Sequence, residues 1–225
     1  MADPAVAQQR RARANIAAVV VLVLALLVGA YLFQRSQDAG PVDAPAAGAS
    51  DYGLAIGDPD APHELIVYED FLCPFCRAFE DASNEQLAAA AAAGKVYVEY
   101  RPFVLLSRAG DYSLRSTNAF AVVLKASGPE VAKKFHDLLY ADQPEETGPF
   151  PDDDWLVEKA VAAGAEEDAV RPGIEGLSEK AWAEAATKGA ADAGVGGTPT
   201  IILDGEQQTA DNVTDIAKSV LAAIG

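Results

Sequence analysis

Two cysteines separated by two residues, Cys73 and Cys76, are the residues of this chain whose type and spacing most clearly predict chemistry. They are the only two cysteines among the 225 residues, and they enclose Pro74 and Phe75. On the first turn of a helix both sulfur atoms can meet in one small disulfide ring. Such a pair is suited to thiol–disulfide exchange, in which a thiolate attacks a disulfide sulfur.

A predicted strand and a predicted helix position this motif. Residues 64–68 form a short apolar run that is typical of a buried strand. Residues 77–82 contain good helix formers, and Pro74 fits a first helical turn because its missing N–H would have no partner there. A helix N-terminus carries partial positive charge and free N–H groups, which stabilise a thiolate at Cys73. The sequence therefore predicts a redox-active pair at a strand-to-helix junction.

Two other roles for the cysteine pair stay open, namely half of a zinc site and a purely structural disulfide. Structural zinc needs four ligands, and neither His63 nor His136 has a finger-like spacing from the pair. We expect His63 in the loop before the strand and His136 on the solvated side of an amphipathic helix, with neither in catalysis. We therefore expect no metal, and no cofactor beyond a redox-active Cys73–Cys76 disulfide.

A second motif, Gly197-Thr198-Pro199, lies more than 120 residues after the cysteines and just before an apolar strand. Glycines ahead of Pro199 give the backbone freedom, and a cis bond at this proline would turn the chain sharply. The backbone of Thr198 could then pair with an extended substrate chain by strand addition. The alternative is a trans proline that opens a strand.

The remaining segments predict an α/β fold with an inserted helical subdomain. A second strand is expected over 95–103 and a third over 198–203, followed by a closing helix over about 212–223. The residues between the second and third strands, about 105–193, show helical rather than strand patterns. Their expected helices lie at 118–126, from a Ser127 cap and Pro129 onward, from 152–154 onward, and at 177–193. Trp155 and Trp182 are expected in the core of this insertion.

The N-terminal region predicts a single membrane anchor. Residues 16–33 carry no charge, and at ~1.5 Å per residue they would span ~27 Å, close to the hydrocarbon thickness of a bilayer. Three arginines in the preceding segment, 1–15, predict a cytoplasmic N-terminal tail. Residues 34–51 are expected to be a flexible linker and 52–225 the folded domain. A cleaved signal peptide is the alternative, although its apolar region is usually shorter. Both alternatives place the cysteines outside the cytoplasm, where disulfides persist.

The formal net charge of −17, from 34 acidic and 17 basic residues, bounds the partners. A surface of this sign repels nucleic acid and anionic lipid headgroups. We therefore expect no nucleic-acid partner.

Three stretches carry a resemblance to a known family. EDFLCPFCRAFE and GGTPTIILDG resemble the strand–CPxC–helix motif and the cis-proline loop of the DsbA-like thiol–disulfide oxidoreductases of the thioredoxin superfamily. FHDLLYADQPEE, residues 135–146, resembles part of the helical insertion of the membrane-anchored bacterial members. The resemblance covers about 52–225 and implies a thioredoxin-like fold with a helical insertion. It also implies that Cys73 is the exposed nucleophile, Cys76 the buried resolving thiol, and Pro199 a cis-proline facing them.

The chain departs from that family's pattern at two positions. Phe75 stands where the best-known oxidases carry histidine, so we expect a less depressed pKa of the Cys73 thiol and a less oxidising couple. Val67 stands where the family often has a buried carboxylate, so proton handling must use Glu69, Asp70 or water. The hydroxyl of Thr198 could hydrogen-bond the Cys73 sulfur.

The resemblance implies an extracytoplasmic dithiol oxidase. Its substrates would be unfolded secreted proteins with cysteine thiols, and its own reoxidation would need a membrane quinone-linked partner of the DsbB or vitamin K epoxide reductase type. We expect a monomeric, single-pass protein of the cell membrane. A disulfide reductase or isomerase of the same fold is one alternative, and a non-catalytic substrate-binding module is another.

Overall fold

The computed structural model describes residues 42–225, which form one compact unit. The tail predicted over 1–15 and the membrane anchor predicted over 16–33 lie outside the described residues. Within 42–225, no helix combines the length and the apolar character that crossing a bilayer requires.

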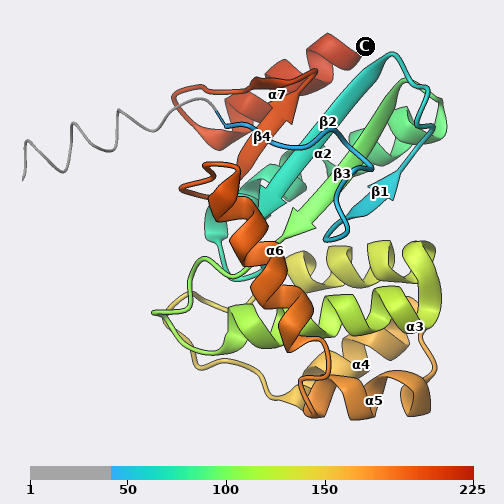
Figure 1. Cartoon of the computed structure of the whole chain (residues 1–225), viewed down its shortest axis with the longest axis vertical. Helices are drawn as coiled ribbons and strands as arrows, with labels where there is room; N and C mark the ends of the chain where they lie inside the picture. Colours follow the sequence, from blue (N-terminus) through green and yellow to red (C-terminus); the bar gives the residue numbers. More distant parts are fainter. Residues whose placement is uncertain (1–41) are drawn as a thin grey trace, which may run out of the picture. The chain divides into compact units, whose positions relative to one another are not determined.

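The unit is built on a five-stranded mixed sheet with the spatial order β1-β3-β2-β4-β5 (Figure 1). The two central strands, β2 (His63–Glu69) and β3 (Val96–Pro102), are parallel. β4 (Thr200–Leu203) pairs antiparallel with β2, and the short edge strands β1 (Leu54–Ile56) and β5 (Glu206–Gln207) pair antiparallel with β3 and β4. The three strands expected from sequence are confirmed. The two edge strands were not predicted, since they contain only three and two residues.

Two helices, α2 (Pro74–Ala92) and α7 (Val213–Ile224), pack together against one face of the sheet. Successive side chains of a strand point to opposite faces, so Leu65 and Val67 of β2 join this core while Ile66 and Tyr68 join the other. α7 begins at an Asn212 cap, whose side chain accepts a hydrogen bond from the N–H of Asp215 at 2.9 Å.

The expected helical insertion lies between β3 and β4 and forms the lower half of the view in Figure 1. It contains α3 (Tyr112–Ala141), α4 (Asp153–Ala163), α5 (Glu167–Glu175) and α6 (Lys180–Asp192). The predicted break near Ser127 is confirmed as a kink inside α3, where Gly128 adopts φ 81°. Trp182 is buried and Trp155 partly buried in the insertion core, as expected. α5 was not predicted, because Pro172 and Gly173 within it read as helix breakers.

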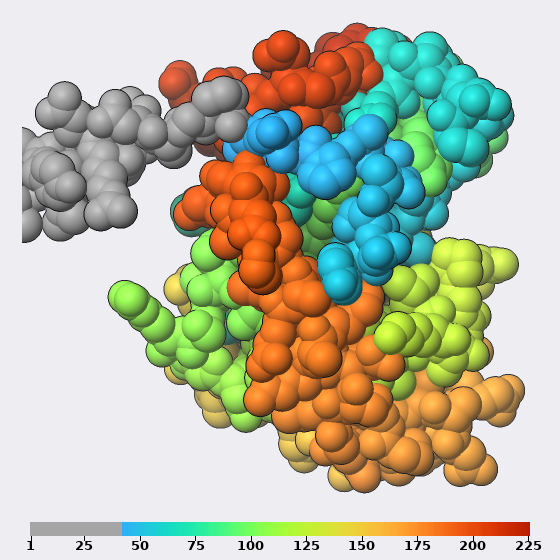
Figure 2. All heavy atoms as spheres, viewed as in Figure 1, coloured from blue at the N-terminus to red at the C-terminus, as the bar shows by residue number. Residues whose placement is uncertain are grey.

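The described part of the segment expected to be a flexible linker, residues 42–51, contacts the folded unit. The Arg101 guanidinium donates to the carbonyl oxygens of Pro45 and Ala46 at 2.8 and 2.9 Å, and Glu99 accepts from the N–H of Gly48 at 2.8 Å. In Figure 2 this segment, in blue, lies over the sheet beside α6. The folded unit therefore begins earlier than the predicted boundary at Tyr52.

Candidate active site

Cys73 and Cys76 lie at the predicted strand-to-helix junction. Cys73 is the N-cap residue of α2, and Pro74 occupies the first helical turn. Both cysteines are free thiols in this structure, and they are 5% and 1% exposed. Cys73 was expected to be exposed, and this is wrong for the residue as a whole. The adjacent Phe75, at 64% exposed, is the large side chain that the motif presents to solvent.

The second motif meets the first, as expected. The peptide bond between Thr198 and Pro199 is cis. The Cys73 thiol donates a hydrogen bond to the backbone carbonyl of Thr198, with 3.4 Å between sulfur and oxygen across 125 residues of sequence. Gly197 closes the turn, since its carbonyl accepts a hydrogen bond from the Thr200 hydroxyl at 2.8 Å. All members of both motifs are thus adjacent.

The Thr198 hydroxyl, which we expected to hydrogen-bond the Cys73 sulfur, has no hydrogen-bond partner while Cys73 is a thiol. The backbone carbonyl takes the thiol proton instead. A thiolate carries no proton to donate, so it would accept from this buried hydroxyl rather than contact the carbonyl.

The two thiols have opposite acidities. Hydrogen bonding by the Cys76 thiol is the largest cause that lowers the pKa of Cys73 from 9.0 to about 6; burial opposes it, and the Thr198 side chain and the N–H groups of Cys76 and Phe75 assist. Burial raises the pKa of Cys76 well above 9.0, with further contributions from Cys73 and the carboxylate of Glu69. Cys73 is therefore the nucleophile and the better leaving group.

Gln143, which sequence reasoning did not single out, connects the helical insertion to the active-site loop. Its side-chain amide donates to the carbonyl oxygens of Phe71 and Cys73, each at 3.0 Å. It lies in the stretch 135–146 that carried the family resemblance. A polar residue just after a helix end was the available signal, but nothing local to Gln143 indicates a partner 70 residues away.

The candidate proton-handling carboxylates differ in their surroundings. Val67 is fully buried among apolar side chains. Asp70 is also fully buried, and it accepts from the N–H groups of Leu72, Leu105 and Leu106 and from the Ser113 hydroxyl. Glu69 is fully buried too, but its Oε2 atom has no partner. Asp70 thus organises loops, whereas Glu69 keeps an unused acceptor.

Both histidine predictions need correction. His136 is fully buried rather than solvated, because its Nε2 atom contacts Glu69 Oε1 at 2.7 Å inside the core. His63 is the first residue of β2 rather than a loop residue, and its Nδ1 atom contacts Asp204 Oδ2 at 2.9 Å. Each histidine is thus engaged by a carboxylate rather than by the cysteines.

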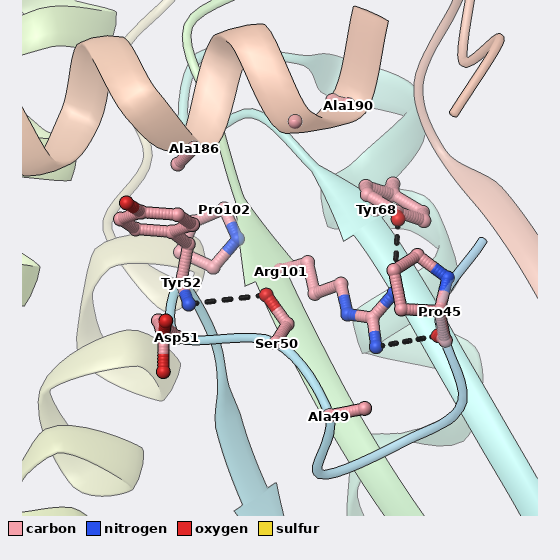
Figure 3. A pocket seen from close by; sticks show the side chains of 11 residues that line it. Pro45, Ala49, Ser50, Asp51, Tyr52, Tyr68, Arg101, Pro102, Ala186 and Ala190 are labelled. Carbon is pink, nitrogen blue, oxygen red and sulfur yellow. Dashed lines mark hydrogen bonds between the residues drawn. The ribbon is translucent and has the colours of Figure 1, made fainter. Parts of the chain in front are cut away.

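A hollow of about 230 Å³ lies apart from the two motifs, between the first described residues and α6 (Figure 3). Arg101 forms part of its wall and donates to the Tyr68 hydroxyl at 2.9 Å. None of the cysteine or cis-proline residues lines it.

Comparison with known families is decisive here. A family profile described as thioredoxin matches residues 49–221, which is more than half of the chain. The chain belongs to this thioredoxin family. No curated protein sequence matches.

Solved structures narrow this assignment. Oxidised DsbA from Mycobacterium tuberculosis is 25% identical, with a TM-score of 0.62 over 77% of this chain and 93% of that one. The reduced disulfide bond oxidoreductase DsbG of the same organism is 25% identical, with a TM-score of 0.63 over 84% and 97%. BdbD from Bacillus subtilis shares the fold at 19% identity, with a TM-score of 0.67 over 81% and 98%. The chain is therefore a DsbA-like thiol–disulfide oxidoreductase with a helical insertion.

Proposed function

We propose that this DsbA-like protein is an extracytoplasmic dithiol oxidase that introduces disulfides into secreted or envelope proteins. The observation that carries the proposal is the opposite acidity of the two thiols in the Cys73–Cys76 pair. A stabilised Cys73 thiolate favours the reduced form of the protein, and a protein that is stable when reduced oxidises its substrates.

The exchange proceeds in two steps. A substrate thiolate attacks the Cys73 sulfur of the oxidised protein, which forms a mixed disulfide and expels the Cys76 sulfur. A second thiolate of the substrate then attacks the substrate sulfur of the mixed disulfide and expels Cys73 as a thiolate. The substrate loses two electrons and the protein gains them. The low pKa of Cys73 favours the second step, because a more acidic thiol leaves faster.

The surroundings of Cys73 are suited to an extended, unfolded substrate. Phe75 offers an exposed apolar surface next to the sulfur. The backbone of Thr198, whose carbonyl contacts the Cys73 thiol in the free protein, would pair with the substrate backbone. This mode of binding uses main-chain groups and so accepts many sequences.

The cellular setting of the proposal comes from the sequence. Residues 16–33 would anchor the protein in the cell membrane by a single pass, with a cytoplasmic N-terminus. A quinone-linked membrane partner of the DsbB or vitamin K epoxide reductase type would reoxidise the Cys73–Cys76 pair. The protein would act as a monomer, with this disulfide as its only redox group.

A reductase or isomerase of the same fold is the second candidate. The pKa of Cys73, about 6, lies between the values of roughly 3.5 for the strong oxidant DsbA and roughly 7 for the reductant thioredoxin. This intermediate acidity agrees with the weaker oxidant expected from Phe75, and it leaves the direction of electron flow to experiment.

The deciding experiment is the equilibrium of the full chain, in detergent, with glutathione redox buffers. A potential near or above about −180 mV supports the oxidase, whereas a value near about −270 mV supports a reductase supplied with electrons across the membrane. If no Cys73–Cys76 bridge forms, the redox assignment itself is contradicted.

Two single substitutions separate the roles of the cysteines. Cys73→Ser should abolish oxidation of a peptide dithiol, because it removes the attacked sulfur. Cys76→Ser should instead accumulate a mixed disulfide at Cys73, visible as a mass increase on a non-reducing gel. Residual dithiol oxidation by Cys73→Ser would contradict the mechanism.

A further inference from the structure

A buried polar cluster lies on the protein side of the Cys73–Cys76 pair. It consists of Glu69 at the end of β2, Glu80 on α2 and His136 on α3, and their side-chain polar atoms lie within 4.8 Å of one another. Glu80 follows Cys76 by four residues, so both lie on the same face of α2. Glu69 and His136 are fully buried and Glu80 is 4% exposed.

The two carboxyl groups of this cluster share too little solvation for both to be ionised. Neither oxygen of Glu80 has a hydrogen-bond partner, and neither does Glu69 Oε2. Burial is the largest cause that raises the pKa of Glu80 from 4.5 to about 8; His136 opposes the rise and the charge of Glu69 adds to it. Glu80 therefore holds a proton at neutral pH, next to an unused acceptor on Glu69.

A chain of hydrogen bonds leads from these carboxyl groups to the surface. Glu69 Oε1 contacts His136 Nε2 at 2.7 Å, and His136 Nδ1 contacts Asp137 Oδ1 at 2.9 Å. The Asp137 side chain is 36% exposed and also pairs with Lys133. Both nitrogens of one imidazole thus join the buried cluster to a carboxylate that solvent reaches.

Cys76 needs such a group. Its sulfur leaves the active-site disulfide as a thiolate in a site where burial strongly favours the neutral thiol. Asp70 is fully occupied by four donors and carries no spare acceptor role in this exchange. Glu80 is the protonated group on the same helix face.

We propose that Glu69, Glu80 and His136 form a proton relay that protonates the Cys76 sulfur when it leaves the disulfide, and that Asp137 connects this relay to solvent. Glu80 loses its proton to Cys76, which becomes a neutral thiol. A proton from solvent then passes through Asp137, His136 and Glu69 and restores Glu80. The helical insertion, which supplies His136 and Asp137, is thereby part of the redox site. This inference rests on the exchange at Cys73 and Cys76 proposed above, and it holds for either direction of electron flow.

The cluster favours a proton over a metal ion. Glu69 and His136 are in direct hydrogen-bond contact at 2.7 Å, which a cation between them would separate. The titratable groups around the cluster come from four elements: Glu69 on β2; Cys76 and Glu80 on α2; Tyr100 on β3; and Lys133, His136, Asp137 and Tyr140 on α3.

The test compares the full chain in detergent with Glu80→Gln, and with Glu85→Gln as the control on an exposed position of the same helix. The rate at which a small dithiol reduces the oxidised protein is measured by acid quench and thiol alkylation across neutral and alkaline pH. We expect Glu80→Gln to slow reduction about tenfold at neutral pH, below the usual range for general acids because a thiolate leaves readily. The deficit should vanish well above pH 8, where wild-type Glu80 has also lost its proton.

A second measurement does not depend on kinetics. Infrared spectra of the wild-type protein should contain the C=O band of a protonated carboxyl group that fades as pH passes about 8 and is missing in Glu80→Gln. A slowing that is the same at every pH, or the lack of this band in folded wild type, would overturn the relay. Thermal stabilisation of the wild type by Zn²⁺ alone, lost in Glu80→Gln, would assign the cluster to metal binding and also overturn it. If wild type itself exchanges no disulfide, the proposed function fails instead.

Discussion

At the scale of single residues, Thr198 determines how well the site holds a charged sulfur. Its carbonyl accepts the hydrogen bond of the Cys73 thiol, while its hydroxyl is buried and unpartnered. The hydroxyl becomes useful only after Cys73 ionises, so its contribution favours the thiolate.

Thr198→Val should therefore raise the pKa of Cys73 above its wild-type value of about 6. Valine keeps the shape of threonine and removes the donor. The ultraviolet absorbance of the thiolate, titrated in the reduced protein, measures the change. Thr209→Val, on an exposed position, is the matched control, and an unchanged titration in Thr198→Val would show that its hydroxyl plays no part.

The raised pKa of Glu80 also predicts how stability depends on pH. The folded state binds this proton more tightly than the unfolded chain does, with a pKa of about 8 against 4.5. Its contribution is fully present below the unfolded pKa and is lost as pH rises through the folded pKa. Oxidised wild-type protein should thus lose stability relative to Glu80→Gln between about pH 5 and 9.

Urea unfolding of the oxidised unit from Pro41 to Gly225 measures this difference. Oxidation removes the titration of both thiols, and His136, whose pKa is raised to about 9 because the Glu69 charge outweighs burial, is common to both proteins. A stability difference that does not change with pH would contradict the assignment of the proton to Glu80.

At the scale of elements, the helical insertion is tied to the loop that carries the nucleophile. Gln143 follows α3 and donates to the carbonyl oxygens of Phe71 and Cys73. These two acceptors lie on the segment between β2 and α2, where no sheet partner is available to them. The insertion thus holds the active-site loop from the side opposite the sheet.

Gln143→Ala should lower the free energy of unfolding by about 1–2 kcal/mol, the usual effect of two partly buried hydrogen bonds. It should also speed alkylation of Cys73, because the loop loses its support. Urea unfolding and iodoacetamide kinetics measure the two effects. Gln86→Ala, at an exposed position of α2, should change neither, and equal behaviour of both variants would rule out the clamp.

At the scale of the whole molecule, the segment before β1 belongs to the folded unit. Arg101 and Glu99, a nearly fully buried ion pair with N···O 2.6 Å, hold its backbone, and the Trp182 indole donates to the carbonyl of Asp51 at 3.2 Å. Removing the segment would leave these groups without partners, and a buried group without a partner costs more than the lost bond.

A piece that begins at Gly53 should therefore be less stable than one that begins at Pro41, by about 2–4 kcal/mol. Chemical denaturation of the two pieces measures the difference. Arg101→Leu in the longer piece should reproduce part of the loss, since it removes the donor for Pro45 and Ala46. Equal stability of the two pieces would mean that the contacts of residues 42–52 contribute nothing.

The sequence by itself determined the features that are local in the chain. The spacing of Cys73 and Cys76, Pro74 in the first turn, and the apolar runs of β2, β3 and β4 each act over a few residues, so their consequences can be deduced without a fold. The cis bond before Pro199 was also expected from its motif and family resemblance.

Only the tertiary structure decided what lies between distant segments. His136 reads as a surface residue on its helix, yet it pairs in the core with Glu69, which is 67 residues away. The roles of Gln143 and of residues 42–51 depend likewise on backbone groups that the fold brings near them. The physical reason is that a polar side chain is compatible with burial only when a partner is present, and a partner from another element leaves no trace in the local pattern.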